Sequence, residues 1–314
     1  MHVSYGVTLA DTIGNTPLVR LDRFTAGHDV TVWAKLESFN PGGSAKDRTA
    51  HAMVVASTLR PGDVVVESSS GNLGVALAQE AVLGGWTFHC VVDPRTNRST
   101  IAHMQALGAV VHEITEPDPA TGDWLTARRT RVGELLREID GAQCLDQYSN
   151  PEAFRAHAEG TMTEILQQLG HAPDHLVVAV STTGTVGGCL RHINAQGLHT
   201  QVTAVDAEGS VLFEGAPGPR HLPGFGAGMV PELANSVKPH QVLRISDRDS
   251  VAGARRLAKL EAILPGASGG AVAAGVEKLL PELAPGSEVV LILHDNGTRY
   301  LDTIYNDDWV EANL

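Results

Sequence analysis

The sequence predicts an α/β fold with two lobes, each built on a mostly parallel sheet flanked by helices. Short apolar, β-branched runs alternate with helical segments along most of the chain. This alternation implies parallel strands joined by right-handed crossovers. The length of 314 residues suits one large or two smaller lobes, and an apolar fraction of 43% is enough for a substantial core.

The first half of the chain supplies three strands and three helices in alternation. We predict strands at residues 64–66, 88–92 and 109–114, and helices at 73–83, 98–107 and 124–139. A further helix is predicted to begin near Lys46, directly after a Pro-Gly-Gly turn. Short β-branched runs of this kind are typical of buried parallel strands.

The alternation resumes after residue 146, which predicts a boundary between the lobes at residues 146–150. Asn150 is a plausible N-cap for a helix at residues 151–169, because Pro151 suits the first helical position. Strands at 176–180, 202–205 and 289–293 and helices at 184–194, 250–262 and 268–283 complete the prediction. Residues 208–237 are rich in proline and glycine and are predicted to form loops.

Charge and cysteine content exclude several classes of function. A net charge of −13 argues against nucleic-acid binding and against attachment to anionic membranes. No run of about 18 apolar residues predicts a membrane span, and the N-terminus has no features of a secretory signal. Cys90, Cys144 and Cys189 are odd in number and far apart, which favours reduced thiols in the cytoplasm. The histidines and cysteines show no ligand spacing, so no metal is expected.

Lys46 occupies an unusual place for a lysine. The chain has only five lysines, and this one follows the turn at residues 40–45, at the predicted start of a helix. The unpaired N–H groups at a helix N-terminus already carry partial positive charge, so a free ammonium is disfavoured there. Lys46 is therefore either tolerated by chance or has an amine that acts as something other than a surface cation.

Three loops rich in glycine, serine and threonine follow predicted strands and open helices, at residues 68–72, 181–185 and 265–270. Loops at the carboxyl ends of parallel strands bind ligands and offer N–H groups to anions. A helix N-cap is the commoner explanation for any one of them. None matches the dinucleotide or Walker phosphate-loop pattern. Pyridoxal phosphate carries both an aldehyde for a lysine and a phosphate, and it accounts for Lys46 and the loops together.

Six segments in order resemble the motifs of the fold-type II pyridoxal-phosphate enzymes of the cysteine synthase and cystathionine β-synthase family. They lie at residues 13–19, 40–48, 71–72, 181–185, 224–228 and 266–268. The resemblance runs over almost the whole chain. It implies a smaller lobe at residues 36–148, a larger lobe formed by residues 1–35 and 149–314, and a homodimer.

The resemblance also implies a role for each site residue. Lys46 would form the Schiff base with the cofactor and move the substrate's α-proton. Asn72 would bond the ring hydroxyl, and Ser268 would face the pyridine nitrogen, although Ser268 also suits a helix N-cap. The phosphate would lie against Ser181, Thr182, Thr183, Gly184 and Thr185. The substrate would contact Ser69, Ser70 and Gly71, with Gly224 in the loop that closes over it.

Departures from the family pattern bear on the substrate. Leu73 replaces a threonine of the substrate loop, and Ser181 and Thr183 replace two glycines of the phosphate loop. Residues 67–78 and 294–310 are similar to the branch that contains N-(2-amino-2-carboxyethyl)-L-glutamate synthases, which serve 2,3-diaminopropionate formation for siderophores and peptide antibiotics. The resemblance implies β-replacement on O-phospho-L-serine through an α-aminoacrylate, with L-glutamate as nucleophile.

Arg128, Arg129 and Arg131 form a basic cluster in an acidic chain. Pairing with Glu134 on a solvated helix face is the commoner explanation. We favour Arg128 as an anion anchor, with Tyr148 as a contact for the second substrate.

Two further alternatives for the function of the protein remain: an O-acetylserine or O-phosphoserine sulfhydrylase, and a non-catalytic regulatory homologue. A cystathionine β-synthase with heme and regulatory regions would need a longer chain.

Overall fold

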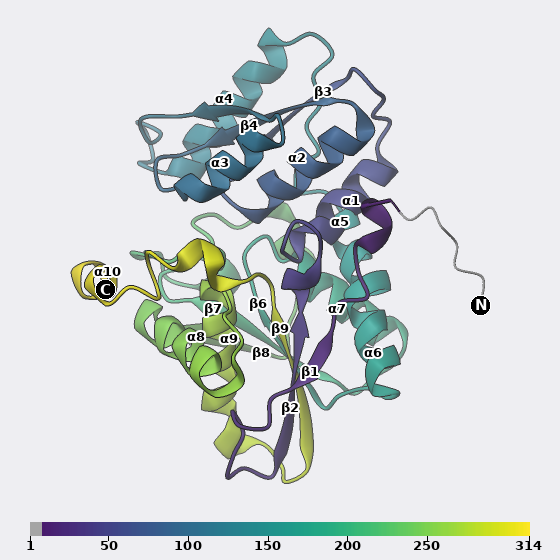
Figure 1. Cartoon of the computed structure of the whole chain (residues 1–314), viewed down its shortest axis with the longest axis vertical. Helices are drawn as coiled ribbons and strands as arrows, with labels where there is room; N and C mark the ends of the chain where they lie inside the picture. The colour runs from purple at the N-terminus through teal and green to yellow at the C-terminus, as the bar shows by residue number, and fades with distance from the viewer. Residues whose placement is uncertain (1–7) are drawn as a thin grey trace.

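The computed structural model describes residues 8–314 and contains two separate sheets, each flanked by helices (Figure 1). The larger sheet has six strands in the order β1-β2-β9-β6-β7-β8. Their bounds are Leu18–Arg20, Val30–Leu36, Ser287–Leu293, His175–Ala179, Gln201–Ala207 and Gln241–Ile245. All neighbours are parallel except β1 and β2. We call this sheet and its helices the larger lobe.

The smaller lobe contains the parallel three-stranded sheet β3-β4-β5. Its strands run over Val64–Ser68, Thr87–Val92 and Val110–Glu113. Helices α1 (Lys46–Ala56), α2 (Asn72–Gly84) and α3 (Arg98–Ala106) share a buried apolar cluster with one face of the sheet. Helix α4 (Trp124–Glu138) packs on the other face through Val132 and Leu135. The predicted α/β class with two parallel-sheet lobes is confirmed.

Alternating side chains bury both faces of the larger sheet. Val177 and Leu291 belong to the cluster formed with α8 (Asp247–Glu261) and α9 (Ala267–Leu279). Val178 and Ile292 belong to the opposite cluster, with α5 (Glu152–Arg155) and α7 (Gly184–Ala195). Figure 1 shows α8 and α9 on one side of this sheet and α6 (Thr163–Leu169) and α7 on the other. Burial on both faces explains why these strands are continuous apolar runs in the sequence.

Most of the predicted elements are present, with ends shifted by a few residues. The sequence analysis did not identify β1, β2, β8 or the final helix α10 (Asp307–Asn313). Strands β2 and β8 each contain a basic residue, Lys35 and Arg244, which weakens the apolar pattern. The helix predicted at 151–169 is interrupted by a π-helical segment at Ala156–Met162, which separates α5 from α6.

A buried network of charged side chains joins β2, α1 and α6. Arg48 donates to Glu37 at 2.7 Å and to Glu164 at 2.6 Å, while Lys35 donates to Glu164 at 2.7 Å. Burial raises the pKa of Glu164, but the hydrogen bonds and charge of Arg48 outweigh it and hold this pKa at about 2. Thr16 closes the network by donating to Glu37 at 2.8 Å. The motif at residues 13–19 is therefore tied to the helix that begins with Lys46.

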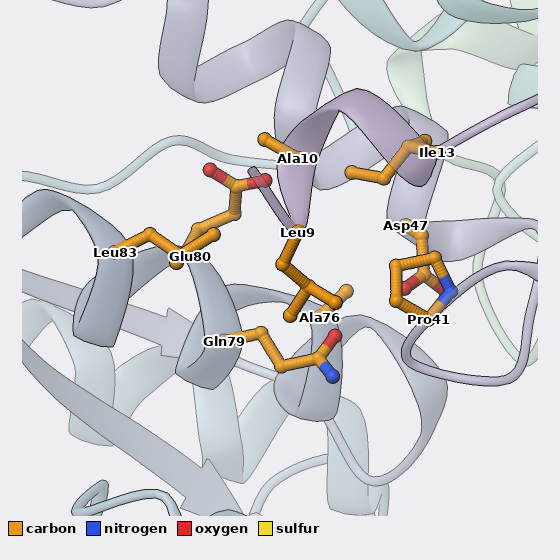
Figure 2. A pocket seen from close by; sticks show the side chains of 9 residues that line it. All are labelled: Leu9, Ala10, Ile13, Pro41, Asp47, Ala76, Gln79, Glu80 and Leu83. Carbon is orange, nitrogen blue, oxygen red and sulfur yellow. The ribbon is translucent and has the colours of Figure 1, made fainter. Parts of the chain in front are cut away.

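The N-terminal segment also packs on the smaller lobe. Leu9 and Ile13 lie beside Pro41 and residues of α2, including Ala76 and Leu83 (Figure 2). The space they enclose is about 10 Å³, room for about one water molecule. This contact places the chain before β1 against the helix pair that carries Lys46 and Asn72.

Candidate active site

Lys46 is the first residue of α1, and its half-buried side chain extends toward the larger lobe. The Nζ atom lies 3.3 Å from Oγ1 of Thr182, which belongs to the loop between β6 and α7. Burial lowers the pKa of Lys46 from 10.5 to about 8. The amine is therefore much easier to deprotonate than an exposed lysine, as a nucleophile or proton carrier requires.

Hydrogen bonds with α1 and with the larger lobe hold the turn before Lys46 in place. The Asp47 carboxylate accepts from the backbone N–H groups of Gly42 at 2.5 Å and Ser44 at 3.1 Å. The Ala45 N–H donates at 2.8 Å to the carbonyl group of His294, which follows β9. An acid in the first turn and a bond to the opposite lobe hold the lysine backbone in place.

The loop at residues 181–185 forms a cradle at the N-terminus of α7. Thr182, Thr183, Gly184 and Thr185 are buried, and Ser181 is half-buried. Thr183 has a φ of +66°, a strained conformation for a branched residue, and its hydroxyl is buried without a hydrogen-bond partner. The first N–H groups of a helix have no partner within it, and together with the unused hydroxyl of Thr183 they suit a bound phosphate.

His157, in the π-helical segment, lies beneath this cradle. Its Nε2 atom is 3.2 Å from the hydroxyl of Thr185 and 3.3 Å from that of Thr49 in α1. Its Nδ1 atom is 2.9 Å from the hydroxyl of Thr161. Burial, followed by the nearby positive charge of Arg48, lowers the pKa of His157 well below its usual value. A neutral imidazole thus links the phosphate cradle to the helix of Lys46. The sequence analysis did not identify this residue.

Asn72 opens α2 in the smaller lobe and is held at both ends of its amide. Its Nδ2 atom donates to Asp295 at 2.9 Å, and its Oδ1 atom accepts from Arg299 at 2.5 Å. Tyr300 also donates to Asp295, at 2.9 Å. Asp295, Arg299 and Tyr300 were not predicted as site residues, although their segment carries part of the family resemblance.

The residues next to Asn72 form the expected substrate loop. The Ser69 hydroxyl accepts from the N–H of Gly74 at 2.9 Å, while Ser70 and Gly71 are half-buried. Leu73 is only 2% exposed and belongs to the apolar core of the smaller lobe. The departure at Leu73 was expected to bear on the substrate, but the side chain is used in core packing instead.

Ser268 is the second residue of α9 and is 3% exposed. The preceding Gly266 must lack a side chain, since a Cβ there would lie 2.1 Å from Oδ1 of Asp295. This close approach brings the N-terminus of α9 against the segment after β9. Ser268 thus lies near the same end of the larger sheet as the phosphate cradle.

His294 has two unsatisfied ring nitrogens. Both are buried without a hydrogen-bond partner, although the backbone of Ile292, near the end of β9, lies close to the ring. Burial, and next the positive charge of Lys46, lower the pKa of His294 to about 4. Buried ring nitrogens without partners are rare and indicate room for a bound group or water beside Lys46.

The three arginines of α4 have different surroundings. Arg128 is 7% exposed, and its Nε atom lies 3.3 Å from Asp93, so it points into the protein. Arg129 is exposed and lies 5.6 Å above the ring of Tyr148. Arg131 pairs with Glu134 and Glu138 at the surface, as a solvated helix face predicts.

Gly224 lies in the predicted closing loop, exposed, with a φ of +96° that favours glycine. A Cβ at this position would be 3.6 Å from the hydroxyl of Tyr300. The loop is anchored by the Gly226 N–H, which donates to the carbonyl group of Val180 at the end of β6. Gly224 therefore lies close to the group that holds Asn72.

These residues fit pyridoxal phosphate. They offer an amine of lowered pKa, a helix N-terminus with an unused hydroxyl at Thr183, and an oriented amide at Asn72. No set of three or more histidine, cysteine or acidic side chains within residues 8–314 is placed to hold a metal ion. In the same part of the chain, no helix has the length and apolar character needed to cross a membrane.

Comparisons with known proteins agree with this fit. A family model described as pyridoxal-phosphate dependent enzyme matches residues 9–295. An O-acetylserine dependent cystathionine β-synthase from Helicobacter pylori is 28% identical, with a TM-score of 0.88 over 98% of this chain and 100% of that chain. An O-ureido-L-serine synthase is 29% identical, with a TM-score of 0.87 over 98% of this chain and 100% of that one. A hydrogen sulfide-producing enzyme from Fusobacterium nucleatum is 26% identical, with a TM-score of 0.87 over 95% and 100%.

Proposed function

Because the chain belongs to the family of pyridoxal-phosphate dependent enzymes, we propose that it catalyses β-replacement on an activated L-serine. The first substrate would be O-phospho-L-serine and the nucleophile L-glutamate. The carbon–oxygen bond to phosphate breaks, and a carbon–nitrogen bond to glutamate forms. The product would be N-(2-amino-2-carboxyethyl)-L-glutamate, for 2,3-diaminopropionate, siderophore or peptide natural-product biosynthesis. An O-acetylserine dependent cystathionine β-synthase and an O-ureido-L-serine synthase among the similar structures support the reaction class.

Lys46, Asn72, Ser268 and the loop at residues 181–185 would hold the cofactor. Pyridoxal phosphate supplies an aldehyde for amines and a conjugated ring that stabilises negative charge at the substrate's α-carbon. Lys46 would bind it covalently, and Asn72 would orient the ring through its amide, itself held by Asp295 and Arg299. The neutral hydroxyl of Ser268 would not force protonation of the ring nitrogen, which favours β-elimination over transamination.

The amine of Lys46 would also carry the α-proton. A pKa of about 8 instead of 10.5 raises its neutral fraction at pH 7 by roughly a hundredfold or more. The Nζ atom then takes the proton from the α-carbon and later returns it. Ser69, Ser70 and the N–H groups of their loop would hold the substrate carboxylate during both transfers.

The buried Arg128 of α4 is the observation that carries the substrate assignment. Arg128 is almost fully buried, and Asp93, its nearest carboxylate, is shared with Arg95. The Nε atom of Arg128 has no hydrogen-bond partner among residues 8–314. A buried guanidinium that shares its nearest carboxylate with another arginine is suited to bind a phosphate or a second carboxylate. Tyr148 would contact the same substrate.

A matrix of incubations tests the proposal. The holoenzyme is given O-phospho-L-serine or O-acetyl-L-serine, each with L-glutamate or sulfide, and products are identified by mass. We expect the phosphoserine and glutamate pair to give the most product. Cysteine from every sulfide incubation, with no glutamate adduct, would contradict the proposal and indicate a sulfhydrylase.

We also propose that the protein works as a cytoplasmic homodimer, as the family resemblance implies. Several large apolar side chains are exposed in the first 83 residues: Leu9, Phe39, Val55, Val82 and Leu83. Leu9 and Leu83 lie near one another around the pocket of Figure 2. Exposed apolar groups on one part of a surface support a protein contact there. Light scattering after size exclusion should give twice the chain mass, and a monomer mass would contradict the proposal.

A further inference from the structure

Arginines from both lobes gather near residues 226–229 of the predicted closing loop. Arg95, Arg128 and Arg129 lie on the smaller lobe, and Arg220 lies on the larger lobe in the loop before Gly224. The Arg220 guanidinium is close enough to Arg95 for the two charges to repel. Four acids lie among these arginines: Asp93 beside Arg95 and Arg128, and Asp123, Asp206 and Asp247 around Arg220.

Two of these arginines share a single ion-pair partner, and the other two have none within ion-pair distance in the described part of the chain. Arg95 and Arg128 share the carboxylate of Asp93, at 3.1 and 3.3 Å. Neither Arg129 nor Arg220 has a carboxylate within 4 Å among residues 8–314. Within the described residues, Arg129 and Arg220 are therefore not held in an ion pair, although Asp206, Asp123 and Asp247 lie close enough to act on Arg220.

The acids that lie around Arg220 already have other partners. Asp206 binds the guanidinium of Arg244 at 2.7 Å, and Asp247 binds the ring of His221 at 3.1 Å. Asp123 caps α4 through its Oδ2 atom, which accepts from the N–H and hydroxyl groups of Thr126, while its Oδ1 atom faces Gly228 as Arg220 does. Burial lowers the pKa of Arg220, with Arg95 acting in the same direction and Asp206 opposing. A half-buried cation of this kind is costly without a bound anion.

Arg129 and Arg220 approach one short segment of the closing loop. A Cβ at Gly226 would lie 3.3 Å from Nη1 of Arg220, and one at Gly228 would lie 3.1 Å from Nη2. The Nη1 atom of Arg129 lies 3.8 Å from the sulfur of Met229. The two guanidinium groups therefore flank residues 226–229, one from each lobe.

We propose that Arg129 and Arg220 bind the two carboxylates of a dicarboxylic amino acid that serves as the second substrate. This inference rests on the proposed β-replacement and adds the residues that select its nucleophile. Each planar guanidinium can hold a carboxylate through two parallel hydrogen bonds. A ligand held by one arginine from each lobe would also draw the closing loop toward α4. Sulfide has no carboxylate and would gain nothing from either residue.

Arg129→Gln and Arg220→Gln variants of the holoenzyme test this, with Arg131→Gln as the matched control. Arg131 lies on the same helix but is paired with Glu134 and Glu138 at the surface. We expect KM for L-glutamate to rise at least tenfold in the first two variants. The KM for sulfide and the release of phosphate from O-phospho-L-serine without nucleophile should stay within twofold. Arg220→Lys should give an intermediate KM for L-glutamate.

Binding of glutarate provides a readout that does not need turnover. Glutarate has two carboxylates but no amine, and its binding to the holoenzyme can be measured by titration calorimetry against butyrate. We expect glutarate to bind more tightly than butyrate, and Arg220→Gln to remove at least tenfold of its affinity. Circular dichroism and the thermal midpoint show whether each variant folds. If Arg220→Gln does not fold, the affinities of Arg220→Lys and Arg129→Gln for glutarate test the proposal instead.

The outcomes separate this inference from the proposed function. Glutamate turnover that is equally insensitive to Arg129→Gln, Arg220→Gln and Arg131→Gln would overturn the inference and leave the β-replacement intact. Equal affinity for glutarate and butyrate would also overturn it. Glutarate binding that depends on Arg220, in a protein that does not accept O-phospho-L-serine, would support the site and contradict the assignment of the first substrate.

Discussion

Lys46 shows how a single side chain reflects its surroundings. At a helix N-terminus and in a cleft between lobes, its ammonium form is disfavoured by burial, which lowers its pKa to about 8. The position was identified from the sequence, because a lysine after a Pro-Gly-Gly turn conflicts with the helix dipole. The contact with Thr182 was not, because it joins residues 136 positions apart.

Replacing Lys46 should stabilise the protein without cofactor. The folded state disfavours the ammonium, so the unfolded chain binds the proton more tightly between pH 8 and 10.5. The loss of stability caused by the buried Lys46 is therefore complete below pH 8 and disappears as pH rises through 10.5. We expect Lys46→Met to raise the unfolding free energy at pH 7 by about 1–3 kcal/mol. Urea unfolding of the cofactor-free proteins at pH 7 and pH 10.5 measures it. If the variant and the unsubstituted protein differed by the same unfolding free energy at pH 7 and at pH 10.5, the pKa of Lys46 would not be lowered in the folded state.

His157 should tune affinity for the cofactor's phosphate. Its imidazole links Thr185 of the cradle to Thr49 of α1, so His157→Phe removes the support for one phosphate contact. We expect about a tenfold weaker affinity for pyridoxal phosphate, equivalent to roughly 1.4 kcal/mol, and little change for pyridoxal. Fluorescence titration of the cofactor-free protein with both compounds measures it, and His157→Asn should recover part of the affinity. Equal losses for both compounds would show that His157 supports the fold alone.

At the scale of elements, the apolar and glycine patterns identified the central strands and the helices that open at the site. They did not identify β2, because Lys35 interrupts its apolar run and is buried only with the help of Glu164. They also did not identify the π-helical segment. There Gly160 admits Arg48, since a Cβ would lie 2.9 Å from Nη1. Both features depend on charged partners from distant parts of the chain, which local patterns do not reveal.

The network of Lys35, Glu37, Arg48 and Glu164 should be a main source of stability for these elements. Arg48→Met would leave two buried carboxylates with fewer partners, and we expect it to destabilise the fold by about 3–5 kcal/mol. Because the pKa of Glu164 is lowered to about 2, its contribution is complete above pH 4.5 and is lost as pH falls toward 2. Urea unfolding between pH 3 and pH 7 measures both effects. A loss below 1 kcal/mol for Arg48→Met would contradict this assignment.

At the scale of the whole molecule, the two lobes bring together loops that are far apart in the sequence. Lys46 and Asn72 come from the smaller lobe, while the phosphate cradle and Ser268 come from the larger lobe. The motif order predicted this combination of residues. It did not predict Asp295 and Arg299, which hold Asn72, or the unpaired state of Arg220, because such contacts require the folded geometry. Leu73 was misassigned for the same reason, since its burial in the core is a property of the packed lobe.

The preference for the nucleophile tests the account most directly. The holoenzyme is given O-phospho-L-serine together with equal concentrations of L-glutamate and sulfide, and the products are quantified by mass spectrometry. Carboxylate binding by Arg129 and Arg220 predicts N-(2-amino-2-carboxyethyl)-L-glutamate as the main product, with phosphate released in equal amount. Cysteine as the main product, with no glutamate adduct, would contradict the account.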